Sequence, residues 1–466
     1  MLRVWNVSLI VLTYTLALLG TFLVRSGILE SIHAFGASTV GGPLLALIGV
    51  VVIGSTVLIV ARLGDLRSER RIESLFSRES VFLVNNLLLV GLAAVIFWGT
   101  FFPLISEALT GEKSSLGPPW FDRFVAPLAI VLVLFTGIGP LLAWRRVSPG
   151  SLWRLVRAPL AVAGVVTVAV AVFTDALEAP MAFVLFAFAS FALAALVTEF
   201  WRGAGAQRAL GGGSRVSALG RVVTRNRRRY GGYIVHAGIA ILFIAVAASS
   251  SFQTSSDLRL LPGESAKVGD YDVTYVRPTS SIDPKEQRLS FGSVLDVSKD
   301  GKRYATLYPS RNYYSSTTSD ATIAGFFEGE ATSEVGRRTT AGGDLWTAMR
   351  PDLTPLDDVI AAVDKRLQRS LPDIGPGGPT PAQVGAMRAY TNRQGEAIRN
   401  LAALYVANPL PIDFRVNVNP LVIWIWIGGG VAVLGGLFAV WPAPEARRRR
   451  VADVYAARLA RDLGRA

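Results

Sequence analysis

The sequence predicts a mainly α-helical, polytopic integral membrane protein of about eight transmembrane helices, with one extracytoplasmic α+β domain inserted before the last helix. Three observations support this fold class. Apolar residues make up 51% of the 466 residues and charged residues only 17%, whereas soluble domains carry roughly 25% charged residues. The net charge is nevertheless +13, and the basic residues of the short loops are concentrated in every second loop. A soluble chain of two or three domains is therefore excluded.

Eight apolar segments are long enough to cross a membrane, whose hydrocarbon core of about 30 Å needs ~20 helical residues. The fifth is the shortest. The first is long enough to act as an anchor, so we expect no cleavable signal peptide. The segments are Trp5–Leu23, Pro43–Leu63, Val81–Pro103, Phe124–Trp144, Ala158–Phe173, Met181–Trp201, Tyr230–Ala248 and Pro420–Trp441.

The basic residues fall in every second loop, which predicts that both termini are cytoplasmic. The alternate loops hold only Arg25, Lys113 and Arg123. Basic cytoplasmic loops usually set orientation and contact the anionic lipid membrane, so they do not indicate nucleic acid as a partner. The basic loops contain Arg62, Arg67, Arg70, Arg71 and Arg78, then Arg145, Arg146, Arg154 and Arg157, then Arg202, Arg208, Arg215, Arg221, Arg225 and Arg227–Arg229, and finally Arg447–Arg450.

The chain is predicted to divide into four parts. Residues 1–251 form seven membrane helices with short loops, and residues 252–419 form the extracytoplasmic domain. Residues 420–441 form the last helix, and residues 442–466 form a basic cytoplasmic tail. The outer domain carries 19 basic and 20 acidic residues, a net charge of −1 that leaves +14 for the rest.

Local patterns assign strands to the first half of the outer domain and helices to the second. Tyr271, Val273 and Tyr275 alternate with polar residues, and Asp300-Gly301 is typical of a hairpin turn. Helices are expected over Leu356–Leu371 and Ala382–Val406, separated by the proline- and glycine-rich Pro372–Pro381. A last strand is expected over Ile412–Val418.

Few side chains can bind a metal or act as a nucleophile or acid–base catalyst, because the chain has no cysteine and only two histidines. Without cysteine there is no disulfide, thiolate ligand or thiol nucleophile. His33 lies just past the outer end of the first span, where it either caps a short amphipathic turn or is an axial ligand of a metal or heme. Arg25 and Phe35 would then suit a porphyrin carboxylate and ring face.

His236 lies inside the seventh span, where an ionisable side chain is costly and indicates a functional site. Neutral imidazole is a good iron ligand. Gly232 and Gly238 flank it, and their small size would let a flat macrocycle lie close to the helix backbone. Alternatively, the glycines serve helix–helix packing and the histidine makes an interhelical hydrogen bond.

The two histidines are expected to lie ~20 Å or more apart along the membrane normal, because His236 is only ~9 Å deep from Tyr230 and His33 lies beyond the opposite face. They cannot be the two axial ligands of one heme. If each binds a heme, each site needs a second ligand from a missing piece or a partner subunit.

Six blocks of sequence resemble the CcmF family of cytochrome c-type biogenesis proteins, the heme lyases of the bacterial cytochrome c maturation system. They run through nearly the whole chain, whereas the middle of the outer domain matches only loosely. The blocks are Trp5–Ser8, Leu19–Gly27, Ser31–Phe35, Gly137–Arg146, Asn226–Gly238 and Pro420–Gly429.

The resemblance implies a role for both histidines. His33 corresponds to one of two external ligands of the heme being transferred, and His236 to one of two membrane ligands of a resident heme b. The family's tryptophan-rich W-G-x-x-W-x-W-D motif and its other two histidines, all upstream of the stretch matching Trp5, are absent here. The chain therefore resembles the C-terminal portion, as a fragment, a miscalled start or a split-gene product that works with the upstream half.

The implied function is that of a heme lyase subunit in the inner membrane. It would receive heme from a heme chaperone and join its vinyl groups, through thioether bonds, to the thiols of apocytochrome c outside the membrane. The apocytochrome-delivery subunits of the maturation complex would be further partners. The alternative function is a membrane transporter or anchor with an extracytoplasmic receptor domain. The absence of Asp, Glu, Lys and Arg near the midplane of the predicted spans argues against ion coupling.

Overall fold

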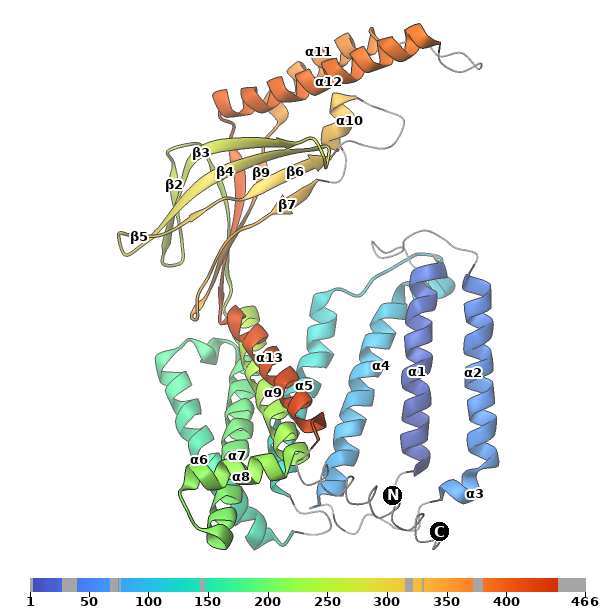
Figure 1. Ribbon diagram of the computed structural model, residues 1–466, viewed down its shortest axis with the longest axis vertical. Helices are drawn as coiled ribbons and strands as arrows, with labels where there is room; N and C mark the ends of the chain where they lie inside the picture. Colours follow the sequence, from blue (N-terminus) through green and yellow to red (C-terminus); the bar gives the residue numbers. More distant parts are fainter. Residues whose placement is uncertain are drawn as a thin grey trace, which may run out of the picture. The chain divides into compact units, whose positions relative to one another are not determined.

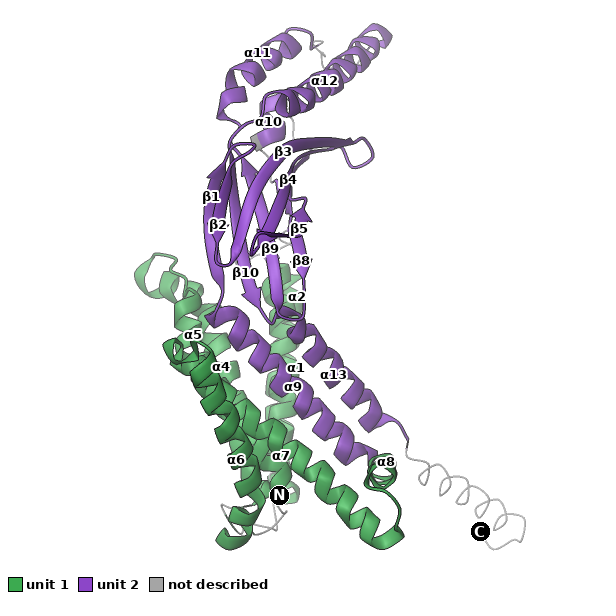
Figure 2. Cartoon of the chain, turned by 90° about the vertical axis from the view of Figure 1, so that its left-hand side faces the viewer, with its two compact units in different colours: residues 1–226, 443–466 green, residues 227–442 purple. Residues whose placement is uncertain are grey.

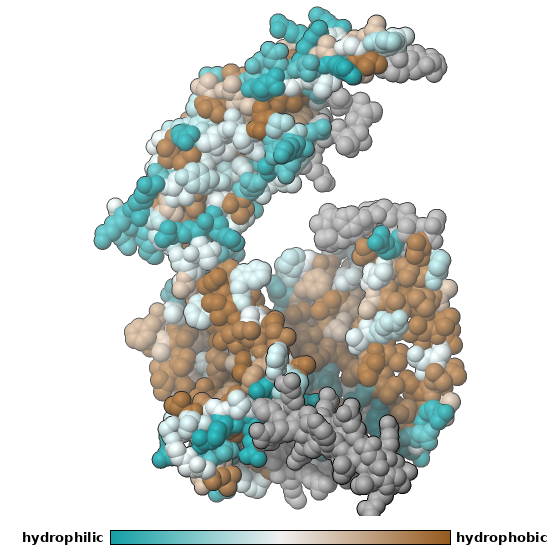
Figure 3. All heavy atoms as spheres, in the orientation of Figure 1, coloured by the Kyte–Doolittle hydropathy of each residue, from teal (hydrophilic) through white to brown (hydrophobic). Residues whose placement is uncertain are grey.

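The structure is a computed structural model, which describes residues 3–26, 40–67, 74, 77–142, 147–314, 322–328, 331–371 and 380–442. The chain forms two compact units: residues 1–226 with 443–466, and residues 227–442 (Figure 2). Eight helices of the described residues are long and apolar enough to cross a membrane, and all eight predicted spans are confirmed among them. Hydrophobic residues cover these helices, whereas hydrophilic residues dominate the surface of the strand-rich part (Figure 3).

The first unit consists of helices, six of which are candidate spans (Figure 1). The fifth span is longer than predicted, because its helix begins at Pro149 instead of Ala158. Ser148 caps it by accepting a hydrogen bond from the backbone N–H of Ser151, and proline suits the first helical position. The helices are α1 (Arg3–Ser26), α2 (Gly41–Ala61), α3 (Leu63–Leu66), α4 (Arg78–Thr110), α5 (Pro118–Leu141), α6 (Pro149–Phe173), the 3₁₀ turn η1 (Ala176–Glu178), α7 (Pro180–Gly211) and α8 (Arg215–Arg225).

Helices α5 and α7 pack closely because Gly137 has no side chain. A Cβ atom there would lie 2.7 Å from the Cα atom of Ala192. Arg78, at the start of α4, donates to the carbonyl oxygens of Gly139 and Pro140 at 3.3 and 3.0 Å. It thereby satisfies carbonyls at the C-terminal end of α5, where a cation is favoured.

The second unit contains α9 (Arg227–Ser251), a domain of ten strands and further helices, and α13 (Val422–Val440). Its strands form two antiparallel sheets, in the orders β1-β10-β9-β8 and β2-β3-β4-β6-β7, with β5 paired to β4. The strands are β1 (Thr254–Leu260), β2 (Ser265–Val268), β3 (Tyr271–Asp283), β4 (Arg288–Lys299), β5 (Lys302–Leu307), β6 (Ser310–Tyr314), β7 (Thr332–Glu334), β8 (Gly336–Thr339), β9 (Gly343–Pro351) and β10 (Ile412–Pro420).

The predicted hairpin and last strand are both confirmed. Asp300 and Gly301 join β4 to β5 with φ angles of 52° and 71°. Positive φ at both central residues is the property of a type I′ turn, which matches the twist of the strands that it connects. One apolar core lies between the sheets and the neighbouring helices, and Tyr275, Phe291 and Phe414 are fully buried in it.

Among the described residues, three helices accompany these strands: α10 (Ile323–Glu328), α11 (Asp357–Gln368) after the 3₁₀ turn η2 (Thr354–Leu356), and α12 (Pro381–Ala407). The last two confirm the predicted helices. Thr380 and Gln383 form a capping box at the start of α12. The predicted break at Pro372–Pro381 lies mostly outside the described residues, which resume at residue 380.

Two paired strands continue directly into two paired helices. Strand β1 follows α9 and pairs with β10, which leads into α13. Leu421 makes the junction with φ 57°, and its N–H donates to the carbonyl of Gly342 at 3.1 Å. Trp424 donates from Nε1 to the carbonyl of Ala341 at 2.9 Å. The hairpin between β8 and β9 therefore holds the start of α13 against the sheet.

Helices α9 and α13 approach at glycines on both sides. A Cβ atom on Gly231 would lie 2.7 Å from the backbone of Ala439, and one on Gly238 would lie 2.5 Å from the nitrogen of Ala432. The same is true in reverse for Gly428 and Gly435, at 2.7 Å from the backbone of α9. The glycines recur every seven residues, which keeps them on one face of each helix.

Changing Gly238 to Ala should weaken this helix pair, because the added methyl group overlaps the backbone of α13. We expect a cost of about 1–3 kcal/mol, seen as a lower apparent melting temperature of the detergent-solubilised protein. Gly436→Ala, in α13, is the matched control, since a Cβ atom there meets nothing within 4 Å. It should be neutral or stabilise by up to about 1 kcal/mol. Equal effects of the two changes would contradict the packing described.

The outer domain should lose stability in alkali through its buried tyrosines. Burial raises the pKa of Tyr275 to about 12, while an unfolded tyrosine titrates near pH 10. Stability from the neutral hydroxyl is thus complete below pH ~10 and is lost as the pH rises to ~12. Tyr275→Phe keeps the buried ring and should flatten this decline by at most about 1.4 kcal/mol per pH unit. Urea unfolding between pH 9 and 11.5, followed by fluorescence, would measure it.

Candidate functional site

His236 lies in α9, on a different side of the helix from α13. At the glycine contacts, the residues of α9 that approach α13 include Gly231, Ile234, Val235, Gly238 and Leu242. At 100° per residue, His236 is turned by about 100–160° from each of them. Its side chain is half-buried and its Nδ1 atom is shielded from solvent. The imidazole therefore belongs to a face of α9 that the close contact with α13 leaves available.

The two glycines that flank His236 differ in their surroundings. Gly238 packs against α13, as the helix-packing interpretation expects. Gly232, one turn before His236 and on the same face, has no atom within 4 Å of the position where a Cβ atom would stand. Gly232 thus leaves a shallow space beside the imidazole, which the macrocycle interpretation requires.

Two polar residues share this face and were not singled out from the sequence. Arg229 and Tyr233 precede His236 by seven and three residues, which places all three along one side of the helix. Nε of Arg229 donates to the hydroxyl of Tyr233 at 2.7 Å, and its guanidinium carbon lies 5.5 Å from the ring centroid. Helical spacing from His236 could have identified both residues, but the run Arg227–Arg229 was interpreted as an orientation signal.

The described part of this face fits one side of a heme. It offers an imidazole nitrogen, a space over Gly232 for the edge of a flat ring, and a cation held toward one end of the helix for a carboxylate. It supplies one axial ligand. No group of three or more histidine, cysteine, aspartate or glutamate side chains among the described residues could hold a metal ion in another way.

The heme site predicted around His33 cannot be described from the structure in the same way. His33 and Phe35 lie outside the described residues. Arg25 is described and lies in the last turn of α1, with an exposed side chain. The separation expected between the two histidines therefore stays a prediction.

Comparisons with known proteins identify the family of this chain. No family model matches the chain. The cytochrome c-type biogenesis protein CcmF of Pseudomonas aeruginosa is 30% identical over 93% of this chain and 54% of its own length. CcmF of Escherichia coli K12 is 30% identical over 96% of this chain and 56% of its own length. The chain belongs to the CcmF family of cytochrome c-type biogenesis proteins.

A solved structure of similar fold matches this chain. The structure of a protein described as cytochrome c heme lyase CcmF superposes with a TM-score of 0.58 at 21% identity, over 94% of this chain and 55% of that one. At this identity the match shows the fold: a multi-pass membrane protein with a sheet-containing domain. The chain spans about half the length of the curated relatives that it matches.

Proposed function

We propose that this chain takes part in cytochrome c maturation by holding heme for transfer to apocytochrome c. The observation that carries the proposal is the face of α9 on which His236, Gly232 and Arg229 align away from α13. Membership of the CcmF family supports the process, because relatives of that name are cytochrome c-type biogenesis proteins.

In this proposal His236 donates its neutral imidazole to the iron of a resident heme b. Gly232 lets the ring edge lie against the helix backbone, and Gly238 fixes the register by packing on α13. Arg229, oriented by Tyr233, receives a heme carboxylate. When bound, the heme would supply one-electron redox chemistry. The residues of α9 bind and orient it, and the apolar helix excludes water.

We propose a second heme site around His33. His33 would be an axial ligand of the incoming heme, and Arg25 would contact a carboxylate of that heme. The second axial ligands must come from elsewhere, since the chain contains only the histidines at positions 33 and 236. We propose that they belong to an upstream half, so that this chain corresponds to the C-terminal portion of longer relatives. A heme chaperone, apocytochrome c and its delivery subunits are the further partners of this proposal.

The proposed setting is the inner membrane, with both termini cytoplasmic and the strand domain outside. The basic residues of alternate loops support this orientation. It also puts the strand domain on the side of the membrane where this proposal places attachment to apocytochrome c.

Replacing His236 with Ala should abolish a b-type heme spectrum of the protein purified from its membranes with its bound partners. The loss follows because the only axial ligand assigned to α9 is removed. Reduced-minus-oxidised absorption and pyridine hemochrome content measure it. Val246→Ala, at a partly exposed position of the same helix, should leave the heme content unchanged.

Two further changes test the geometry with the ligand intact. Gly232→Leu should lower heme content severalfold, because its side chain fills the space beside the imidazole, whereas Gly232→Ala should have a smaller effect. Arg229→Gln should lower retention during purification and shift the heme reduction potential. An unchanged spectrum in His236→Ala would falsify the assignment and favour a transporter or an anchor.

A further inference from the structure

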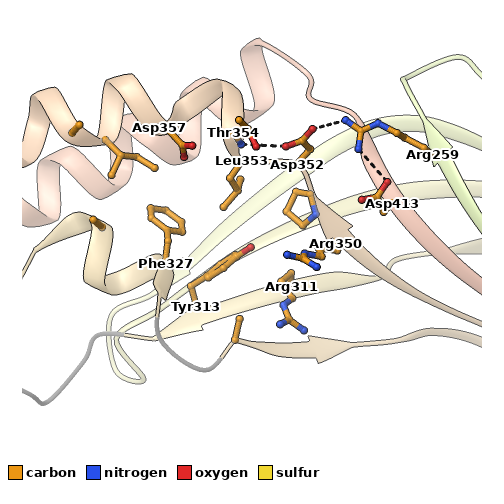
Figure 4. Close-up of a pocket in the computed structure, with 15 residues that line it drawn as sticks. Arg259, Arg311, Tyr313, Phe327, Arg350, Asp352, Leu353, Thr354, Asp357 and Asp413 are labelled. Atoms are coloured by element: carbon orange, nitrogen blue, oxygen red, sulfur yellow. Dashed lines mark hydrogen bonds and ion pairs between the residues drawn. The ribbon is translucent and has the colours of Figure 1, made fainter.

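A cavity of about 1040 Å³ lies in the outer domain, at a place that the sequence did not indicate. It is lined by residues of β1, β6, β9 and β10, by α10 and α11, and by the turn that follows β9 (Figure 4). All of these elements belong to the second unit. The cavity has three walls of different chemistry.

On the first wall, opposite charges neutralise one another. Arg259 of β1 forms ion pairs with Asp352 and with Asp413, the latter at 3.3 Å. Asp352 also accepts the backbone N–H of Thr354 at 3.2 Å. The hydrogen bond from Arg259 is the main reason why the pKa of Asp352 lies below its usual value. This cluster is an internal tie between the sheet and the turn after β9.

The second wall carries two guanidinium groups, those of Arg311 and Arg350. Arg311 of β6 and Arg350 of β9 both act on Tyr313, where burial raises the pKa of the phenol and the two guanidinium groups lower it. Arg311 donates to the hydroxyl of Ser333 at 2.8 Å. In the described part of the chain, neither arginine takes part in an ion pair. Two guanidinium groups around one phenol favour a bound anion, above all a carboxylate.

The third wall is apolar. The ring of Phe327 stacks on Phe291 at 5.9 Å and meets Tyr313 edge-on at 5.1 Å. Leu353 and Ile360 complete this side. Since Phe291 is fully buried in the domain core, Phe327 is held in place before any ligand arrives. A preformed apolar wall beside a cationic one is the usual composition of a binding site.

We propose that this cavity binds a peptide segment in which an acidic side chain, or a terminal carboxylate, lies next to an aromatic or large aliphatic residue. The carboxylate contacts Arg311 and Arg350, and the apolar side chain packs on Phe327. A peptide suits the site because its walls also offer the carboxylates of Asp357 and Asp413, which can accept amide N–H groups. The proposal concerns a partner polypeptide of the outer domain and does not depend on heme binding at His236.

The test is the binding of an N-terminally rhodamine-labelled, C-terminally amidated heptapeptide, Gly-Ser-Phe-Leu-Asp-Gly-Ser-amide, to the full chain in lipid nanodiscs, followed by fluorescence anisotropy. The amide removes the terminal carboxylate, so the Asp side chain is the only carboxylate of the probe. We expect saturable binding that weakens at least tenfold when Asn replaces the Asp of the probe. Arg350→Gln should weaken binding severalfold, and Arg311→Gln with Arg350→Gln should abolish it. The matched control is Arg277→Gln with Lys302→Gln, which removes two positive charges from exposed positions away from the cavity and should leave binding unchanged.

Three results would overturn the proposal. These are equal binding of the Asp and Asn probes, wild-type binding by the double arginine variant, or equal loss in the control variant. Displacement of the probe by anionic lipid vesicles as readily as by unlabelled peptide would assign the cavity to a lipid surface instead. Heme content, measured on the same samples, keeps the two proposals separate, since it should not change in any of these variants.

Discussion

The backbone of α9 lies against that of α13 because glycine occupies four positions where any side chain would overlap the partner helix. Most of the second unit depends on this contact. The two helices are extended by β1 and β10, which pair with each other and form one edge and the neighbouring strand of a sheet. Paired strands lie about 4.8 Å apart, whereas packed helices usually lie about 8–10 Å apart, so close approach of the helices reduces the mismatch where one pair continues into the other. Glycine allows the helices to come close enough for both pairings to persist through the junction.

The same contact determines what His236 can do. Because α13 occupies the side of α9 that carries Gly231 and Gly238, His236 is left on another side with Gly232 and Arg229. A side chain at Gly231 or Gly238 would push α13 away, and a side chain at Gly232 would occupy the space beside the imidazole. Gly231 and Gly238 thus allow close packing of the helices, whereas Gly232 leaves space beside the imidazole.

Patterns within one element were predictable from the sequence, and arrangements between elements were not. Membrane spans follow from length and apolarity, and the hairpin at Asp300 follows from the conformational preference of two residues. Even Pro149 signals the true start of α6, although the helix was placed from Ala158. By contrast, nothing local distinguishes Gly232 from Gly238, since only the register of α13 separates them. Arg229 could not be singled out for a similar reason, because the run Arg227–Arg229 also fits the pattern of an orientation signal.

The outer cavity shows the same limit more clearly. Arg259, Arg311 and Arg350 stand far apart in the sequence and come from β1, β6 and β9. All three are arginines in a domain that is almost neutral as a whole, so composition does not distinguish one from another. Only the fold shows that Arg259 is matched by two carboxylates while the other two surround Tyr313. The order of strands in the two sheets, which brings them together, depends on contacts between distant residues that no local pattern encodes.

The pairing of α9 with α13 also has a consequence for how the protein is made. Roughly 170 residues separate the end of α9 from the start of α13, and ribosomes add about 5–20 residues per second. Helix α9 therefore enters the membrane some ten to thirty seconds before the helix that covers its glycine face. During that interval the glycine face has only lipid or other helices as neighbours, and β1 has no β10 to pair with. The last two elements of this unit therefore complete its assembly: β10 pairs with β1 and β9 to complete the sheet, and α13 packs on α9.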